Sequence, residues 1–478
     1  MNVYQSYRFL LARLHLDSLA GETTAKSIKY TLENLKTGAR SLTQAYEDAI
    51  KRIESQTPAR VSLAKEVLSW IIIAKRPLTA RELQHALAIE IGETELDEDN
   101  IPEIAEIVSV CAGLVVIDKQ SDIIRPVHYT TQEFFELVEK AWIPQARSMI
   151  VNKCVTYLSF DTFLARLVNS HQLVLMLAEN PFLNYAALYW GVHAFQLYSE
   201  EKSSAIVETH ELALRFLQNE SLVQSCTLVQ YHANHKSFFQ YYHHGGAGLH
   251  MAAFFGLAHL CAGLLEQQDD TKVEADPSNE WERTPLSYAA QMGHVAVVKL
   301  LLERADVDIN YMDSQRHGPL SYAAMEGHEA VVKLLLERAD IDINRTNVGG
   351  DGPLSYAARR GHVAVVKLML AKDGVDVNSK NRQGDTPLSY AAEGGHVALV
   401  KLLLERADID VNCKGDNGFT PLIQAVIYEH EAVVKTLLER PEIDAEYRDW
   451  RGWTPLRCAE VTGHKGIVKL LKDHIASH

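Results

Sequence analysis

The chain has 478 residues, enough for about three domains. Its 62 acidic and 47 basic residues give a formal net charge of −15, which argues against general binding to nucleic acid or to an anionic membrane, because both need a positive surface. No apolar stretch approaches the roughly 20 residues of a membrane-spanning helix, and we expect no secretory signal in the first residues. Six scattered cysteines without a C-x-x-C pair exclude a disulfide scaffold or zinc finger, so we expect a cytoplasmic protein.

Residues 1–58 carry apolar residues at helical spacing, such as Phe9, Leu10 and Leu14, and we predict a helical segment there. Within it, the run GETTAKS faintly resembles a phosphate-binding loop. The glycine before Lys26 is missing, however, and no apolar strand precedes the run. No complete phosphate-binding loop and no common hydrolase motif occurs in the chain, so we expect no catalytic residue.

Residues 59–140 predict three helices and a β-wing, which together make a winged helix. The first helix covers Leu63–Ile73, and Thr79 with Glu82 forms a capping box at the start of the second. The third helix follows Pro102. Two strands then alternate around a polar turn, at Leu114–Asp118 and Asp122–Val127.

Winged helices often bind DNA, but the charge of this one argues against it. No Lys or Arg occurs between Glu82 and Lys119. Seven carboxylates crowd the approach to the third helix instead: Glu93, Glu95, Asp97, Glu98, Asp99, Glu103 and Glu106. Phosphates would repel such a helix, so we expect no nucleic-acid partner.

Three motifs of the first half carry a family resemblance. AKRPLTARELQHALA, CAGLV at Cys111–Val115 and VHYTTQEFF resemble the winged-helix module that follows the NACHT nucleoside triphosphatase domain in fungal STAND or NLR-like proteins. The same module is sometimes labelled after GPI inositol-deacylases. Phe9–Leu19 resembles the end of the helical lid of that NACHT domain. Residues 141–245, with Cys154–Leu158 and Phe182–His193, resemble the helical connector that follows.

The resemblance implies that the winged-helix histidine, here His128, reaches a bound nucleotide and holds the closed state. The phosphate-binding and Mg²⁺-binding half of the NACHT domain is absent from this sequence, however. A histidine that is simply packed is therefore the favoured interpretation of His128, and a weak nucleotide contact is the alternative.

Six prolines of the second half lie 34 residues apart, at positions 285, 319, 353, 387, 421 and 455. The surrounding text repeats with them, as in RTPLSYAAQMGHVAVVKLLLERADVDIN. In the first copy Thr284 can cap a short helix that starts at Pro285 and ends at Gly293, and Val297–Leu302 predicts a second helix. A polar hairpin loop leads to the next copy, and a degraded seventh copy precedes the six at Gly248–Leu265.

The pattern T-P-L-x-x-A-A-x-x-G-H at this spacing resembles the ankyrin repeat. The resemblance implies an α-solenoid with hairpin loops over residues 246–478, which binds other macromolecules and carries no chemistry of its own. Its recurring histidines (His294, His328, His362, His396, His430 and His464) lie on copies about 10 Å apart, too far for one metal ion, so we predict that they hydrogen bond between repeats. Asp306, Asp308 and Asn310 mimic a calcium loop, but Tyr311 occupies the position that needs glycine.

We therefore predict a mainly α chain that acts as a non-enzymatic interaction scaffold, with no cofactor and no metal, in an NLR-like signalling or self/non-self recognition system. The alternative is a regulatory fragment of a nucleotide-switched NACHT protein. A protein partner would dock on the concave face and hairpin tips, at Arg359, Arg360, Phe419, Tyr428, Trp450, Arg451 and Trp453. The alternative for Trp450 and Trp453 is that they only cap the end of the array.

Overall fold

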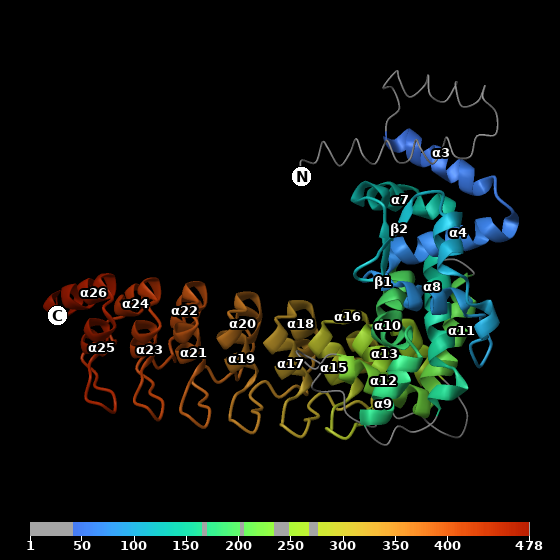
Figure 1. Cartoon of the computed structure of the whole chain (residues 1–478). Helices are drawn as coiled ribbons and strands as arrows, with labels where there is room; N and C mark the ends of the chain where they lie inside the picture. Colours follow the sequence, from blue (N-terminus) through green and yellow to red (C-terminus); the bar gives the residue numbers. More distant parts are fainter. Residues whose placement is uncertain (1–41, 165–169, 201–204, 234–247, 267–275, 478) are drawn as a thin grey trace, which may run out of the picture. The chain divides into compact units, whose positions relative to one another are not determined.

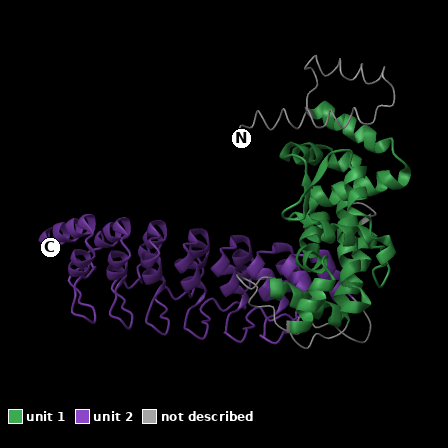
Figure 2. Ribbon diagram, in the orientation of Figure 1, with its two compact units in different colours: residues 1–244 green, residues 245–478 purple. Residues whose placement is uncertain are grey.

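The structure is a computed structural model, and it describes residues 42–164, 170–200, 205–233, 248–266 and 276–477. The chain divides into two compact units, residues 1–244 and 245–478 (Figure 2). The predicted lid-like segment at Phe9–Leu19 and the GETTAKS run lie outside the described residues. The fold is mainly α, as predicted.

The first unit opens with five helices and a small sheet, which include the three helices and the β-wing of the predicted winged helix. In chain order the elements are α3 (Leu42–Glu54), α4 (Pro58–Ile73), β1 (Leu78–Thr79), α5 (Ala80–Ala88), α6 (Ile104–Val110), β2 (Val115–Asp118), β3 (Ile123–Pro126) and α7 (Tyr129–Trp142). The sheet is antiparallel, in the order β1-β3-β2, and Ile124 lies opposite both Leu78 and Ile117. The two-residue strand β1 was not predicted from the sequence, because it is too short to show alternation.

The capping box predicted at the start of α5 is present. The Thr79 side chain accepts a hydrogen bond from the backbone N–H of Glu82, and the Glu82 carboxylate accepts one from the backbone N–H of Thr79 at 2.8 Å. Arg76 donates to both oxygens of the same carboxylate, at 2.6 and 2.9 Å. These contacts hold the loop between α4 and α5 in one conformation.

The remaining helices of the first unit pack on one another around an aromatic core, and one of them also packs on α4. They are α8 (Ala146–Leu158), α9 (Ser170–Glu179), α10 (Leu183–Glu200), α11 (Ala205–Gln218) and α12 (Glu220–Ala233). Trp70 of α4 is fully buried, with ring centroids 5.3 Å from Phe182 and 5.9 Å from Tyr185. Close by, the ammonium of Lys153 on α8 pairs with Glu66 and donates to the carbonyl of Leu87 at 2.9 Å.

The second unit consists of helix pairs at constant spacing. A leading pair, α13 (Gly248–Phe255) and α14 (Ala258–Leu265), precedes six copies, which we number 1 to 6 from the N-terminus. The first helices are α15 (Pro285–Met292), α17 (Pro319–Glu326), α19 (Pro353–Arg360), α21 (Pro387–Glu393), α23 (Pro421–Ile427) and α25 (Pro455–Thr462). The second helices are α16 (Val295–Leu302), α18 (Glu329–Glu337), α20 (Val363–Leu370), α22 (Val397–Leu404), α24 (Glu431–Leu438) and α26 (Lys465–Ser477). Figure 1 shows first and second helices in two rows, with the loops extending from the row of first helices.

The predicted caps are present in copy 1. The Thr284 side chain accepts from the backbone N–H of Ser287, and Gly293 ends α15 with a φ of 75°. Gly318 and Gly352, which stand where other copies carry threonine, provide no side-chain cap, as expected. A β-carbon on Gly293 would lie 2.6 Å from Nδ1 of His328, so the close approach of the next copy also requires glycine.

The histidines join neighbouring copies, as predicted. Nε2 of each donates to a backbone carbonyl of the preceding copy over 2.8 to 3.2 Å, at His294, His328, His362, His396 and His430. His464 lies 3.1 Å from the Glu429 carboxylate instead. In the part of the chain that the structure describes, no group of three metal-ligating side chains is present.

A second ladder, of asparagines, was not predicted. The side-chain amide of each donates to a carbonyl 30 residues ahead at 2.6 or 2.7 Å, at Asn310, Asn344, Asn378 and Asn412. Each side-chain oxygen also accepts the backbone N–H that lies 32 residues ahead, over 2.8 to 2.9 Å. The polar stretch that mimics a calcium loop therefore serves to connect the copies.

Candidate protein-binding surface

Five of the six hairpin tips of the second unit are held by one side chain at their start, and the tip of copy 5 carries Gly415 at that position. In copy 6 the Asp449 carboxylate accepts the backbone N–H groups of Arg451 at 2.8 Å and Trp453 at 2.9 Å. Asp313, Asn347 and Asn381 hold the tips of copies 2 to 4 in the same way. The tips are thus ordered loops, which present the following side chains in fixed positions.

Tyrosines of the first helices line the same side of the array. Copies 1 to 4 carry Tyr288, Tyr322, Tyr356 and Tyr390 at equivalent positions. In copies 1 and 2 the residue two positions before the first helix lies between the tyrosine of its own copy and that of the next. Arg283 is buried in this way, with its guanidinium 3.8 Å from the Tyr288 ring centre and 4.1 Å from that of Tyr322. We did not predict this ladder, although the constant spacing of the tyrosines could have indicated it.

The residue at this position changes character along the array. His317 in copy 2 is hydrogen bonded through Nε2 to the Tyr356 hydroxyl at 2.8 Å. In copy 3, Asp351 accepts from the Tyr390 hydroxyl at 2.9 Å, and in copy 4 Asp385 accepts from the Gln424 amide at 3.2 Å. Burial, with the nearby carboxylates of Glu393 and Asp351, raises the pKa of Asp385. The lining therefore runs from cationic in copy 1 to anionic in copies 3 and 4.

Four of the predicted binding residues come together at the C-terminal tips. The Arg451 guanidinium lies 5.7 Å from the Phe419 ring centre, 5.5 Å from that of Trp450 and 4.3 Å from that of Trp453. We call these four residues the tip cluster. Arg451 is also paired with the buried Asp449 carboxylate at 2.9 Å. Trp450 is 68% exposed and Trp453 is half-buried, so the cluster presents aromatic surface that the array does not cover.

The other three predicted residues lie in copies 3 and 5. The Arg359 guanidinium is 5.1 Å from the Tyr390 ring centre. Tyr428 is 51% exposed, and its hydroxyl is hydrogen bonded to Glu393, whose negative charge raises the pKa of Tyr428. Arg360 is exposed at the end of α19. These side chains are available on the surface, but they do not belong to the tip cluster.

His128, the predicted nucleotide contact, caps the N-terminus of α7. Its Nδ1 accepts from the backbone N–H of Thr130 and lies 2.9 Å from the hydroxyl oxygen of the same residue. Its ring centre is 4.3 Å from that of Tyr129. The ring is half-buried and held in place by local contacts, which is what a packed histidine requires.

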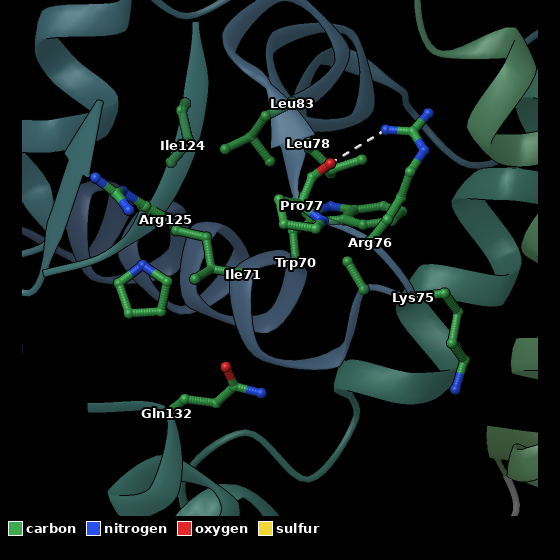
Figure 3. Close-up of a pocket in the computed structure, with 12 residues that line it drawn as sticks. Trp70, Ile71, Lys75, Arg76, Pro77, Leu78, Leu83, Ile124, Arg125 and Gln132 are labelled. Carbon is green, nitrogen blue, oxygen red and sulfur yellow. Dashed lines mark hydrogen bonds between the residues drawn. The ribbon is translucent and has the colours of Figure 1, made fainter. Parts of the chain in front are cut away.

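A cavity of about 170 Å³ opens in the winged-helix domain close to α7 (Figure 3). Apolar side chains of α4, β1 and β3 form its walls, among them Trp70, Ile71 and Ile124, and Gln132 of α7 faces them. Its cations already have partners. Arg76 is bonded to Glu82, Arg125 is paired with Asp118 at 3.3 Å, and Lys75 donates to Gln196. The cavity therefore offers an apolar surface and no evident catalytic group.

Comparisons with known proteins agree with the two units. A family described as ankyrin repeats (three copies) matches residues 249–347, 342–415 and 406–478. The second unit is an ankyrin-repeat array. A family described as the winged-helix domain of GPI inositol-deacylase matches residues 52–142. Ankyrin repeats imply a role in protein–protein interaction, and their fold is typically a non-enzymatic scaffold.

Solved structures similar to the array include two other ankyrin proteins. The ankyrin repeat protein EF0377 is 32% identical, with a TM-score of 0.37 over 39% of this chain and 96% of that one. The ankyrin repeat domain of human ASB11 is 25% identical, with a TM-score of 0.42 over 48% of this chain and 98% of that one. A search of curated proteins finds no match. Among the described residues, no helix is both long and apolar enough to cross a membrane.

Proposed function

We propose that this chain is a non-enzymatic interaction scaffold, and that its ankyrin array is the recognition surface of an NLR-like signalling or self/non-self recognition system. The observation that carries the proposal is the tip cluster. An exposed Trp450 stands beside an arginine that a buried carboxylate holds in place. Tryptophan, tyrosine and arginine are the residues that most often anchor protein interfaces, and anchors held rigidly lose little entropy on binding.

We expect the partner to contact the concave face, which we assign to the row of first helices, together with the hairpin tips. The contact residues we propose are Arg359, Arg360, Phe419, Tyr428, Trp450, Arg451 and Trp453. A protein partner is favoured over nucleic acid because the chain carries a net charge of −15.

The double variant Trp450→Ala, Trp453→Ala tests this proposal. Proteins captured from a cell extract by the full chain are quantified for the wild type, for this variant and for Trp281→Ala, which truncates a tip tryptophan of copy 1 that is 37% exposed. We expect the double variant to lose the captured partner while its melting temperature stays unchanged. If the array melts much earlier and binding per folded molecule persists, the two tryptophans only cap the end of the array.

The resemblance to the C-terminal portion of fungal NACHT proteins supports a division into four parts. We propose a helical segment at residues 1–58, a winged helix at 59–140, a helical connector at 141–245 and the array at 246–478. The match to the winged-helix family at residues 52–142 is consistent with that order. All six cysteines are buried thiols without a disulfide, which supports a location in the reducing cytoplasm.

A second candidate is a regulatory fragment of a nucleotide-switched NACHT protein. It is supported by His128, since Thr130 engages Nδ1 of this ring and Nε2 has no hydrogen-bond partner among the described residues. Calorimetry with ATP or GTP should show no micromolar binding by the chain alone. Nucleotide binding that appears only when a separate NACHT domain is added, and weakens in His128→Ala, would favour the second candidate. Micromolar binding by the chain alone that disappears in His128→Ala would contradict our expectation that this chain by itself does not bind nucleotide.

A further inference from the structure

Copy 1 of the array places a guanidinium of its own on the face of the first helices. Arg283 lies between the rings of Tyr288 and Tyr322 and donates through Nη2 to the Gln291 side-chain oxygen at 2.9 Å. Two aromatic faces and one amide oxygen thus surround a cation that is almost fully buried. This arrangement provides an internal example of how the face holds an arginine.

Three copies further on, the same positions carry acceptors instead. Asp385 replaces Arg283, Glu393 replaces Gln291, and Gln424 replaces Tyr322. The place that holds a cation in copy 1 is therefore lined by two carboxylates and an amide between copies 4 and 5. Together with Asp351 of copy 3, we call these residues the acceptor cluster.

The carboxylates of the acceptor cluster have no cation at ion-pair distance in the described part of the array. Among the described residues, Asp351, Asp385 and Glu393 make no ion pair with Lys or Arg. Their hydrogen bonds are to neutral groups, such as the Tyr390 hydroxyl on Asp351 and the Gln424 amide on Asp385. Arg359 lies over the Tyr390 ring and is the cation that approaches this group. Half-buried carboxylates that repel one another attract a cation from outside.

Gln424 gives an independent indication that a donor is missing. Its side chain is 93% buried, since only 7% is exposed, and its Nε2 points at Asp385. Its Oε1 is buried and has no hydrogen-bond partner among the described residues. A buried acceptor without a donor costs free energy, so a ligand that brings N–H groups would stabilise this site.

We propose that the acceptor cluster binds the guanidinium of an arginine side chain from the protein partner. A guanidinium offers five N–H donors in one plane, which suits Asp385, Glu393 and the Gln424 oxygen, and its face can stack on the exposed ring of Tyr428. Lysine carries a point charge without the planar face and matches this set less well. The inference rests on the proposed role of the array in binding proteins and specifies the chemistry of one contact.

The test selects ligands for the immobilised full chain from a random peptide display library. We expect the selected peptides that bind the face of the first helices to share an arginine. Replacing that arginine with citrulline, which is neutral and nearly isosteric, should weaken binding roughly tenfold or more, and Asp385→Asn or Glu393→Gln in the chain should do the same. The matched control is Asp416→Asn, which removes an exposed carboxylate from the tip of copy 5 and should change the affinity less than twofold.

Asp385→Arg provides a further test, because it introduces into copy 4 the arginine that copy 1 carries at the equivalent position. It should abolish binding of the arginine peptides while the melting temperature of the array is retained. Peptides that bind the array without arginine, or that tolerate both citrulline and Asp385→Asn, would overturn the inference and leave the scaffold role standing. Selection of lysine peptides would also overturn it. If neither a peptide nor a protein binds any part of the array, the proposed function fails as well.

Discussion

Each of the two units is stabilised by its own side-chain contacts, and these contacts span different separations in the sequence. In the array, the bonds of the asparagine and histidine ladders join residues 30 to 40 positions apart and recur in most copies. In the first unit, Lys153 meets Glu66 across 87 positions, and the backbone N–H of Lys75 donates to the Tyr185 hydroxyl across 110. The array is stabilised between neighbours, whereas the first unit depends on contacts that occur once.

This difference predicts different responses to damage. Repeat arrays behave approximately as one-dimensional systems, in which each copy is stabilised by itself and by its two neighbours. A defect in a middle copy should therefore separate the two ends. A defect in the first unit should lower the stability of the whole winged helix and connector, because its core joins α4, α8 and α10.

The largest effect is expected from Ala357→Asp with Ala358→Asp in copy 3. Both alanines are fully buried in α19, which packs between α17 and α21. Two unpaired buried carboxylates should cost on the order of 5 kcal/mol or more and uncouple copies 1 and 2 from copies 4 to 6. Hydrogen exchange read by mass spectrometry would then show different protection on the two sides.

The matched control for this pair is Arg359→Asp with Arg360→Asp, at the next two positions of the same helix. Both arginines are exposed, so the array should keep uniform protection. If the buried alanine variant also unfolds in a single unchanged transition, the description of the array as stacked copies is wrong.

The next largest effect is expected from Lys153→Met in the first unit. The variant leaves the partly buried Glu66 carboxylate without its partner, and burial already raises the pKa of Glu66. Breaking a buried pair in this way should cost about 3 to 5 kcal/mol, spread over the winged helix and connector. Hydrogen exchange should report faster exchange throughout α4, α8 and α10 and no change in copies 3 to 6.

The double variant Glu66→Gln, Lys153→Met is its control and should recover part of the loss, because no charge remains buried. Faster exchange confined to the few residues around position 153 would mean that the first unit is not one cooperative body.

Local chemistry explains why much of the fold could be predicted. Thr79 with Glu82, Thr284 with Pro285, and the left-handed Gly293 each act on residues close in sequence, so their roles can be read without the tertiary structure. The strand β1 was not predicted because it pairs with Ile123 and Ile124, which are distant in sequence and are brought close only by the tertiary structure. The pair of Lys153 and Glu66 escaped for the same reason.

The candidate surface was predictable only in part. Residue type and position in the repeat identified Trp450 and Arg451, but not that Asp449 would hold the arginine against three rings. The place of Arg283 between two tyrosines depends on stacking of neighbouring copies, which residue spacing alone does not describe. The identity of the partner depends on another molecule and cannot be read from this chain.

The smallest expected effect concerns the first rung of the asparagine ladder, where the chain carries Asp276. Its carboxylate accepts the backbone N–H of Asp308 at 2.9 Å, as Asn310 accepts that of Asp342 at 2.8 Å. An ionised carboxylate cannot provide the N–H that Asn310 donates to the Asp340 carbonyl. Burial, reinforced by the charges of Asp308 and Asp306, raises the pKa of Asp276 from 3.8 to about 6.

Asp276→Asn should therefore stabilise the array in a manner that depends on pH. Because the pKa of Asp276 is higher in the folded state, folding takes up a proton, and the stability this provides is present below about pH 4 and lost as the pH rises through 6. The gain from asparagine should be close to zero at pH 4 and reach about 1 kcal/mol above pH 7, a value reduced for partial exposure. Urea unfolding of the array at a series of pH values measures it, with Asp373→Asn at an exposed turn as the control. A gain that does not vary between pH 4 and 7 would show that Asp276 is ionised in the folded array throughout this range.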